Sequence, residues 1–219
     1  KLDTVNTASA SMKKQEGSYF DTFFNHTLSY DKRNQKYKTS DGYISRFSQS
    51  IPLLSESYTL TNTYNYKIYN EWQDENILSI GFFGITANSL SGKDIKLSDR
   101  LYLPASKLRG FESGKIGPKD GADYIGGNYA ASVNIATSIS QILPNLQNTD
   151  FSVFFDAANV WGIDYSSSLS DESKIRSSVG IGLDFFTPIG PLSFTLSEPI
   201  TKGKNDITET FRFNLGTTF

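Results

Sequence analysis

The feature that most constrains this chain is a two-residue alternation of apolar and polar side chains along almost its whole length. In VGIGLDF (179–185) apolar residues alternate with glycine or aspartate, and in PLSFTLS (191–197) with serine and threonine. YTLTNTYNYKIY (58–69) and NYAASVNIATSI (128–139) follow the same rule. Because successive strand residues point to opposite faces of a sheet, each segment has one apolar and one polar face. No segment shows the 3.6-residue period of an amphipathic helix, so an all-β chain is expected.

Nine segments follow this period and are predicted to be strands. Most exceed the roughly 5–6 residues of strands in globular proteins and reach the roughly 9–11 residues that a tilted strand needs to cross a bilayer. Between the fourth and fifth segments lies a long loop at about 89–127, and loops of this length are usually functional. The predicted strands lie at 18–31, 43–53, 58–69, 77–88, 128–140, 150–161, 175–187, 191–200 and 209–219.

The two faces of the predicted strands differ in composition. The polar faces carry Ser, Thr, Asn, Gly and Asp, without an even coat of Lys and Glu. Outer-membrane barrels show this pattern, with lipid outside, an aqueous lumen inside and aromatic girdles at both interfaces. The sequence therefore favours an antiparallel transmembrane β-barrel, while a soluble β-sandwich or lipocalin-type barrel stays open on periodicity alone. Aromatic residues near strand ends are Tyr19, Tyr30, Tyr43, Tyr58, Tyr69, Tyr129, Trp161 and Phe185.

Composition argues against several classes of function. A formal net charge of −2 provides no broad basic surface, so no nucleic-acid partner is expected. Cysteine is absent and His26 is the single histidine, which argues against a metal site, a cysteine nucleophile and a Ser-His-Asp triad. No apolar run is long enough for a transmembrane helix. We therefore expect neither a catalytic residue nor a cofactor, and predict that the chain is not an enzyme.

The C-terminal sequence TETFRFNLGTTF (208–219) predicts the direction of the strands. Its apolar residues are expected to face lipid in a strand that runs inward, with the terminal aromatic residue at the inner interface. Counting back from this strand places the short turns inside and the long loops outside, as in bacterial barrels. The residues expected to face lipid are Phe211, Phe213, Leu215 and Phe219. The loops expected outside are 89–127, 162–174 and 201–208, and the turns expected inside are 32–42, 70–76, 141–149 and 187–191.

A series of motifs adds a resemblance to a known family. In chain order they are LRGF (108–111), KIGP (115–118), GGN (126–128), FFDAANVW (154–161), IRSSVGIGLDFFTPIGPLSFTLSEP (175–199) and the terminal ETFRFNLGTTF. Together they resemble the C-terminal part of BamA-type proteins, the family of outer-membrane β-barrel assembly factors. LRGF resembles the V-R-G-F signature of that family's sixth extracellular loop. The terminal motif resembles the family's closing strand and its assembly signal.

The resemblance implies a fold and a function. Residues 1–219 would be the C-terminal portion of one barrel domain, roughly the last nine of sixteen strands, with the POTRA domains absent. The protein would fold and insert β-barrel clients into the bacterial outer membrane, using the last strand to template an incoming strand by β-augmentation. Implied partners are outer-membrane lipid, unfolded β-barrel clients and accessory lipoproteins of the assembly complex. A two-partner-secretion or TamA-like transport barrel of the same superfamily stays open as the alternative.

The resemblance also implies a site inside the barrel. In the family the signature loop folds back into the lumen, and its arginine pairs with acidic residues on lumen-facing strands. Carried over, the loop residues are Leu108, Arg109, Gly110 and Phe111, and Asp156 is the partner of Arg109. A bidentate arginine–carboxylate pair would fix the loop. An ordinary solvated loop arginine is the alternative.

Two departures from the family's pattern and two glycines add further expectations. Ala136 stands where the family often has a glutamate, so a weaker tether is expected. Leu103–Ala105 replaces the usual Gly-Gly before the signature, so the approach of the loop to the lumen is expected to differ. Gly180 and Gly182 are expected on the lumen face, where they either make room for the loop or relieve strand curvature.

Overall fold

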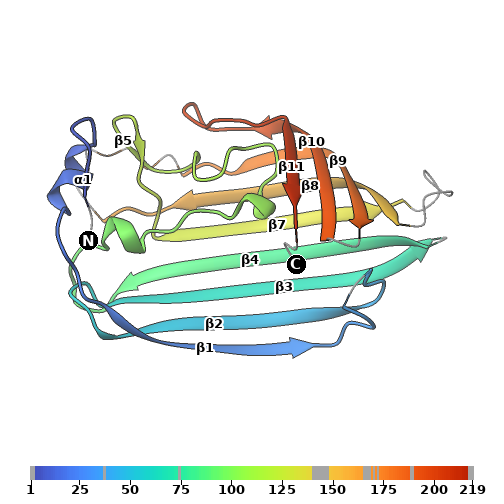
Figure 1. Cartoon of the computed structure of the whole chain (residues 1–219), viewed down its shortest axis with the longest axis horizontal. Coiled ribbons are helices and arrows are strands. Elements are labelled where there is room, and N and C mark those ends of the chain that lie inside the picture. Colours follow the sequence, from blue (N-terminus) through green and yellow to red (C-terminus); the bar gives the residue numbers. More distant parts are fainter. Residues whose placement is uncertain are drawn as a thin grey trace.

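The computed structural model describes residues 3–36, 38–73, 75–139, 148–164, 169, 171, 173–187 and 190–216. Within these residues, nine strands form one antiparallel sheet in the order β1-β2-β3-β4-β7-β8-β9-β10-β11 (Figure 1). A separate two-stranded sheet pairs β5 (Lys119–Asp120) with β6 (Asp123–Tyr124). The nine strands are β1 (Thr22–Asp31), β2 (Gly42–Leu54), β3 (Thr59–Gln73), β4 (Asn76–Ser89), β7 (Tyr129–Ser138), β8 (Thr149–Trp161), β9 (Arg176–Thr187), β10 (Gly190–Thr201) and β11 (Phe211–Leu215).

The prediction of nine antiparallel strands is confirmed, with small differences at the two ends. The strand predicted at 18–31 begins at Thr22, and the carboxylate of the preceding Asp21 accepts hydrogen bonds from Ser55 Oγ at 2.6 Å and the Glu56 N–H at 3.3 Å. The strand predicted at 209–219 is described as Phe211–Leu215, and Phe219 lies outside the described residues. Parts of the predicted turns at 141–149 and 187–191 also lie outside them.

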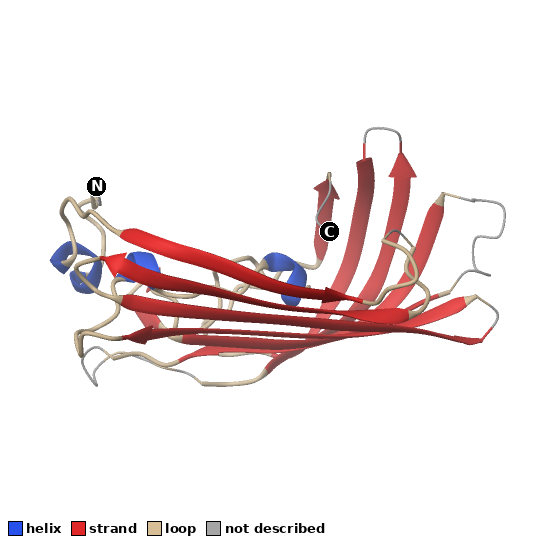
Figure 2. Ribbon diagram, turned by 90° about the horizontal axis from the view of Figure 1, so that it is seen from below, coloured by secondary structure: helices blue, strands red, loops and turns tan. Residues whose placement is uncertain are grey.

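The sheet is strongly curved, and Figure 2 shows it as an open trough with the last strands rising on one side. On its convex face, alternate apolar side chains of the central strands keep 38–42% of their surface exposed, and in the described part of the chain no second sheet or helix layer covers them. A soluble sandwich would bury such residues, so this alternative is wrong. The residues are Phe82, Val133, Ile135, Phe155, Val179 and Ile181.

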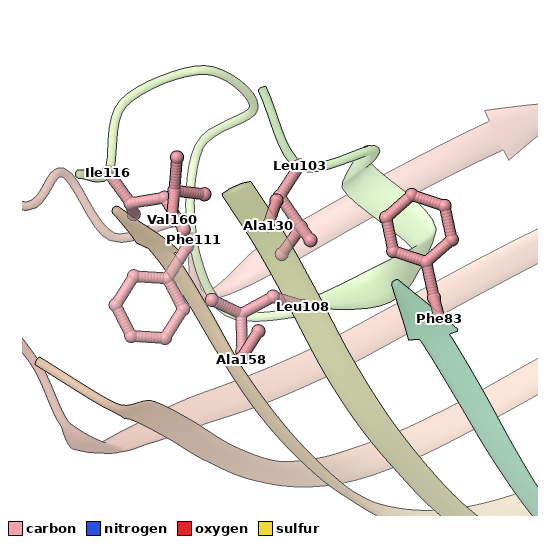
Figure 3. Close-up of a cluster of buried hydrophobic side chains, with 8 residues drawn as sticks. All are labelled: Phe83, Leu103, Leu108, Phe111, Ile116, Ala130, Ala158 and Val160. Carbon is pink, nitrogen blue, oxygen red and sulfur yellow. The ribbon is translucent and has the colours of Figure 1, made fainter. Parts of the chain in front are cut away.

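The long loop that joins β4 to β7 covers part of the concave face. Its apolar side chains pack on inward-pointing residues of β4, β7 and β8, as Figure 3 shows. Ala130 and Ala158 leave room for the loop to approach the sheet closely, and both are almost fully buried. The cluster consists of Leu103, Leu108, Phe111 and Ile116 from the loop with Phe83, Ala130, Ala158 and Val160 from the strands.

In the described part of the chain, three short helical turns lie outside the sheet, and the predicted all-β class is confirmed. They are α1 (Ala10–Lys14), η1 (Leu97–Asp99) and η2 (Ala105–Lys107). Ser9 caps α1 by accepting the Met12 N–H, and the Ser9 N–H donates to Asp123 Oδ2 of the long loop at 2.7 Å. No helix in the described residues is long and apolar enough to cross a membrane.

Candidate functional site

The centre of the concave face is an ion pair between Arg109 of the long loop and Asp156 of β8. Arg109 Nε lies 2.7 Å from Asp156 Oδ2, and Arg109 Nη2 lies 2.7 Å from Asp156 Oδ1. The Arg109 N–H also donates to Oδ2 at 3.0 Å. The Asp156 side chain is fully buried, whereas that of Arg109 keeps 22% of its surface exposed. The structure thus brings these two residues together in the bidentate geometry that gives arginine–carboxylate pairs their specificity.

A third side chain completes the hydrogen bonding of the buried carboxylate. Asn134 lies directly across from Asp156 in the pairing of β7 with β8, and its Nδ2 donates to Asp156 Oδ1 at 2.8 Å. The same amide group donates to the carbonyl oxygen of Lys107 at 2.9 Å. Asp156 therefore receives four donors, which offsets the cost of burying its charge. Asn134 therefore links the Asp156 carboxylate to Lys107 of the loop. Ala136, two residues further along β7, has no polar side chain that could do the same.

The guanidinium of Arg109 rests on the ring of Phe154. The Arg109 guanidinium carbon lies 3.4 Å from the ring centroid, a cation–π contact in a buried setting. Phe154 points to the same face as Asp156, two residues further along β8, and only 5% of its surface is exposed. The edge of the Arg109 guanidinium group thus bonds the Asp156 carboxylate, and its flat face packs on the Phe154 ring.

Gly110 allows the loop backbone to lie against the strands. Its φ of +88° belongs to the left-handed region that favours glycine. A Cβ at this position would lie 3.1 Å from Cβ of Ser178 on β9 and 3.4 Å from Oγ of Ser197 on β10. The Ser178 hydroxyl donates to the carbonyl oxygen of Arg109. Both the conformation and the close contact therefore require a residue without a side chain here.

The segment between β10 and β11 pairs with the long loop beyond Gly110. The Glu209 N–H donates to the Gly110 oxygen at 3.0 Å, and the Glu112 N–H donates to the Ile207 oxygen at 2.9 Å. The Ile207 N–H donates to the Lys115 oxygen at 3.1 Å. These bonds flank an antiparallel bridge between Phe111 and Thr208. The predicted outer loop 201–208 is thus attached to the long loop by main-chain bonds.

A second buried ion pair holds the segment between β10 and β11 to β9. Arg176 Nε and Nη2 lie 2.9 and 3.1 Å from the two carboxylate oxygens of Asp206. The side chain of Arg176 is fully buried and that of Asp206 keeps 2% exposure. Nη1 of Arg176 also donates to Asn159 Oδ1 and to the Lys174 oxygen, each at 2.7 Å. This pair is more fully enclosed than Arg109–Asp156, and no motif of the sequence indicates it.

A third arginine fixes the beginning of the long loop. Arg100, whose side chain is fully buried, forms an ion pair with Asp164, which follows β8. Asp164 also accepts the Ile95 N–H at 2.9 Å. The long loop is therefore attached to the concave face at several points.

Lys107 on η2 is a partly buried cation of the same loop. Burial lowers the pKa of Lys107, and the nearby charge of Lys67 lowers it further.

The remaining predicted site residues fall on two faces. Leu108 and Phe111 are 2% exposed and belong to the packed cluster beneath the loop. Phe211, Phe213 and Leu215 of β11 point to the convex face and keep between 49% and 63% of their surface exposed. In the described residues, no group of three or more His, Asp or Glu side chains is arranged to hold a metal ion.

The fold and this site define a class of protein, the outer-membrane β-barrel type. Its antiparallel sheet has an apolar outer face, and an arginine anchors a long loop on the inner face. The chain belongs to the Omp85 superfamily, whose domain matches residues 1–219. This superfamily comprises outer-membrane β-barrels of bacteria or mitochondria that are involved in assembly, and it is not enzymatic. The predictions of an outer-membrane barrel and of a protein that is not an enzyme are confirmed at this level.

Individual relatives agree with this assignment. The chain is 23% identical over 224 residues to the outer membrane protein assembly factor BamA of Neorickettsia risticii (strain Illinois), covering 100% of this chain and 30% of that protein. It is 27% identical over 231 residues to the sorting assembly machinery 50 kDa subunit of Saccharomyces cerevisiae, covering 96% and 46%. BamA from Haemophilus ducreyi lacking POTRA domains 1-3 has a similar structure, with a TM-score of 0.74, 28% identity and coverage of 86% and 41%. The chain therefore spans less than half the length of each of these relatives.

Proposed function

We propose that this protein is a BamA-like factor that folds and inserts β-barrel clients into the outer membrane of a bacterium. The observation that carries the proposal is the docking of the long loop on the concave face through Arg109 and Asp156, in a chain of this superfamily. The exposed apolar convex face supports a position in lipid. The LRGF segment supports the BamA-like branch.

We further propose that the chain is the C-terminal part of a longer barrel, without the POTRA domains. Two observations support this: the chain spans less than half of its relatives, and β1 and β11 each have a single strand neighbour in the described sheet. Single-chain bacterial barrels have even numbers of strands, so nine would be completed by others.

The proposed mechanism uses β11 as a template. β11 pairs with β10 over five residues, from Leu192↔Leu215 to Leu196↔Phe211, and its other edge has no partner in the described residues. An unpaired edge carries free N–H and C=O groups, so an unfolded client strand can add to it. Phe211, Phe213 and Leu215 would give this strand its lipid-facing side. Lipid, unfolded clients and accessory lipoproteins are the partners, and no cofactor is needed because only hydrogen-bond exchange is involved.

The test is a folding assay with the full-length protein in lipid vesicles. A urea-unfolded outer-membrane barrel is added, and its folded fraction is followed by the shift in gel mobility on heating. We expect the wild-type protein to accelerate folding and Asp156→Asn to slow it by about tenfold or more, since the largely buried guanidinium of Arg109 loses its ionic partner. Asp150→Asn is the matched control, because Asp150 lies on the same strand and its contact with Lys38 is long, at 3.9 Å, and partly exposed.

Two results would contradict the proposal. One is a wild-type protein that leaves the client's folding rate unchanged. The other is passage of a soluble polypeptide through the vesicle wall without client insertion, which would identify a transport barrel of the same superfamily.

A further inference from the structure

Arg212 of β11 connects the last strand to the long loop. It lies opposite Thr195 of β10, which is 8% exposed on the concave face. Arg212 Nη1 donates to the carbonyl oxygen of Ala105 at 2.7 Å, and Nη2 donates to that of Phe111 at 2.6 Å. One side chain of the last strand therefore bonds two points of the loop that lie on either side of Arg109.

Glu209 sets the orientation of this arginine. Glu209 Oε2 lies 2.8 Å from Arg212 Nε and 2.6 Å from Nη2, three residues earlier in the chain. Its own N–H donates to the oxygen of Gly110 at 3.0 Å. A guanidinium has five donors in a rigid plane, so it can bond a carboxylate and two carbonyls together, whereas an ammonium has no such geometry.

Successive residues of the loop contact successive strands. Arg109 bonds Asp156 on β8, and its carbonyl accepts from Ser178 on β9. Gly110 lies against Ser197 on β10. Phe111 presents its carbonyl oxygen to Arg212 on β11. The segment 109–111 thus crosses four neighbouring strands in their order in the sheet, and Arg212 is its last contact.

We propose that Arg212 is a positioning residue that couples the long loop to β11, so that the last strand is held against the sheet while the loop is docked. The inference rests on the proposed function, in which β11 templates a client strand. In the described residues, main-chain pairing of β11 with β10 is short, with five residue pairs and one further bond from the Ser197 N–H to the Thr210 oxygen. Short pairings with few buried contacts open locally at low cost, so the bonds to the loop decide how often β11 opens. Release of the loop removes those bonds and frees the strand to pair with a client.

The test is amide hydrogen exchange in the full-length protein in lipid vesicles, measured without a client. In Arg212→Gln, amides 211–215 are expected to exchange about tenfold faster or more, because hydrogen bonds from a charged donor are among the stronger ones. Amides 108–111 are expected to stay within about twofold of wild type, since Asp156 still holds the loop. Asp156→Asn should accelerate exchange in both segments, and Arg212→Lys should give an intermediate rate in 211–215. Arg46→Gln on β2, an exposed residue of the same face, is the control and should change neither segment.

Two outcomes would overturn the coupling: unchanged exchange of 211–215 in Arg212→Gln, or equal acceleration throughout β1–β4, which would indicate general destabilisation. The readout contains no client, so it is independent of the assembly assay. A wild-type protein that fails to fold clients would contradict the proposed function, and slow exchange that depends on Arg212 would still establish the coupling.

Discussion

The ring of Phe154 on β8 occupies the space that a side chain at Gly180 of β9 would need. The two residues are direct partners in the sheet, and a Cβ at Gly180 would lie 2.5 Å from Phe154 Cζ and 2.3 Å from the carbonyl oxygen of Leu196. The same ring also carries Arg109, whose guanidinium carbon lies 3.4 Å from the ring centroid. Gly180 therefore makes room for the aromatic surface on which Arg109 rests.

Gly180→Ala is expected to displace both the Phe154 ring and the Leu196 carbonyl group and to destabilise the protein by about 1–3 kcal/mol, the usual cost of inserting a methyl group into packed space. The measurement is denaturant-induced unfolding of the full-length protein, together with the rate of protease cleavage in the long loop. Gly81→Ala is the matched control, because a Cβ there meets no atom closer than 3.8 Å. Equal effects of the two substitutions would show that the close contacts at Gly180 are not the cause.

Arg109 and Asp156 are expected to be strongly coupled in a double-mutant cycle. Asp156→Ala alone should cost about 3–5 kcal/mol, because it leaves a largely buried guanidinium without its carboxylate. The double variant Arg109→Ala/Asp156→Ala should cost less than the sum of the single variants. The comparison pair is Lys38 and Asp150, whose side chains are 43% and 39% exposed and for which a coupling of about 0–1 kcal/mol is expected. Equal coupling energies in the two cycles would contradict the assignment of Arg109 as the main tether.

Asp206→Ala is expected to release the segment between β10 and β11. The substitution leaves buried Arg176 without its carboxylate, at a cost of about 3–5 kcal/mol. Hydrogen exchange of amides 203–209 should rise accordingly. An apolar pair, Arg176→Met with Asp206→Leu, should be more stable than Asp206→Ala, because it removes both charges from the interior. Unchanged exchange of 203–209 in Asp206→Ala would refute this account.

The segment before β1, residues 3–21, is expected to be attached to the turn after β2 and to the long loop in a pH-dependent way through Asp21. A hydrogen bond from the Ser55 hydroxyl, assisted by the charge of Lys96, holds the pKa of Asp21 below its ordinary value of 3.8. Since the folded-state pKa is the lower one, the stabilisation is complete above 3.8 and is lost as the pH falls through the folded-state pKa. A spin label at Val5→Cys should become more mobile in that range, while Asp21→Asn should remove the transition. The same transition in Asp21→Asn would exclude this carboxylate as its origin.

The sheet was predictable from the sequence because each strand carries its own alternating pattern. Val179, Ile181 and their outward neighbours identify a strand without reference to any distant residue. The position of the long loop depends on contacts between segments that are distant in the sequence, and these contacts cannot be predicted from the alternation of side chains. One local signal was present: Phe83 and Phe154 are large apolar residues at positions of polar parity. Such a break in the alternation indicates that something covers the concave face at that point.

The ion pair of Arg176 and Asp206 shows where sequence reasoning stops. Arg176 occupies a lumen position and Asp206 lies in a polar loop 30 residues later, so either one looks like a solvated charge. In the structure both side chains are buried and form an ion pair, because the segment between β10 and β11 packs against β9. The five-residue helix α1 was missed for a different reason: it is too short for a 3.6-residue period to appear.

The most direct test of the account is the accessibility of alternate side chains on β3 in a bilayer. Spin labels are placed by single cysteine substitution at positions 63–68 of the full-length protein in lipid vesicles, and collision with oxygen is compared with collision with a water-soluble nickel chelate. We predict oxygen-rich surroundings for labels at Tyr64, Tyr66 and Ile68, and nickel-accessible surroundings for labels at Thr63, Asn65 and Lys67. Labels with the same accessibility at all six positions, or the opposite alternation, would contradict a sheet with lipid on its convex face and water on its concave face.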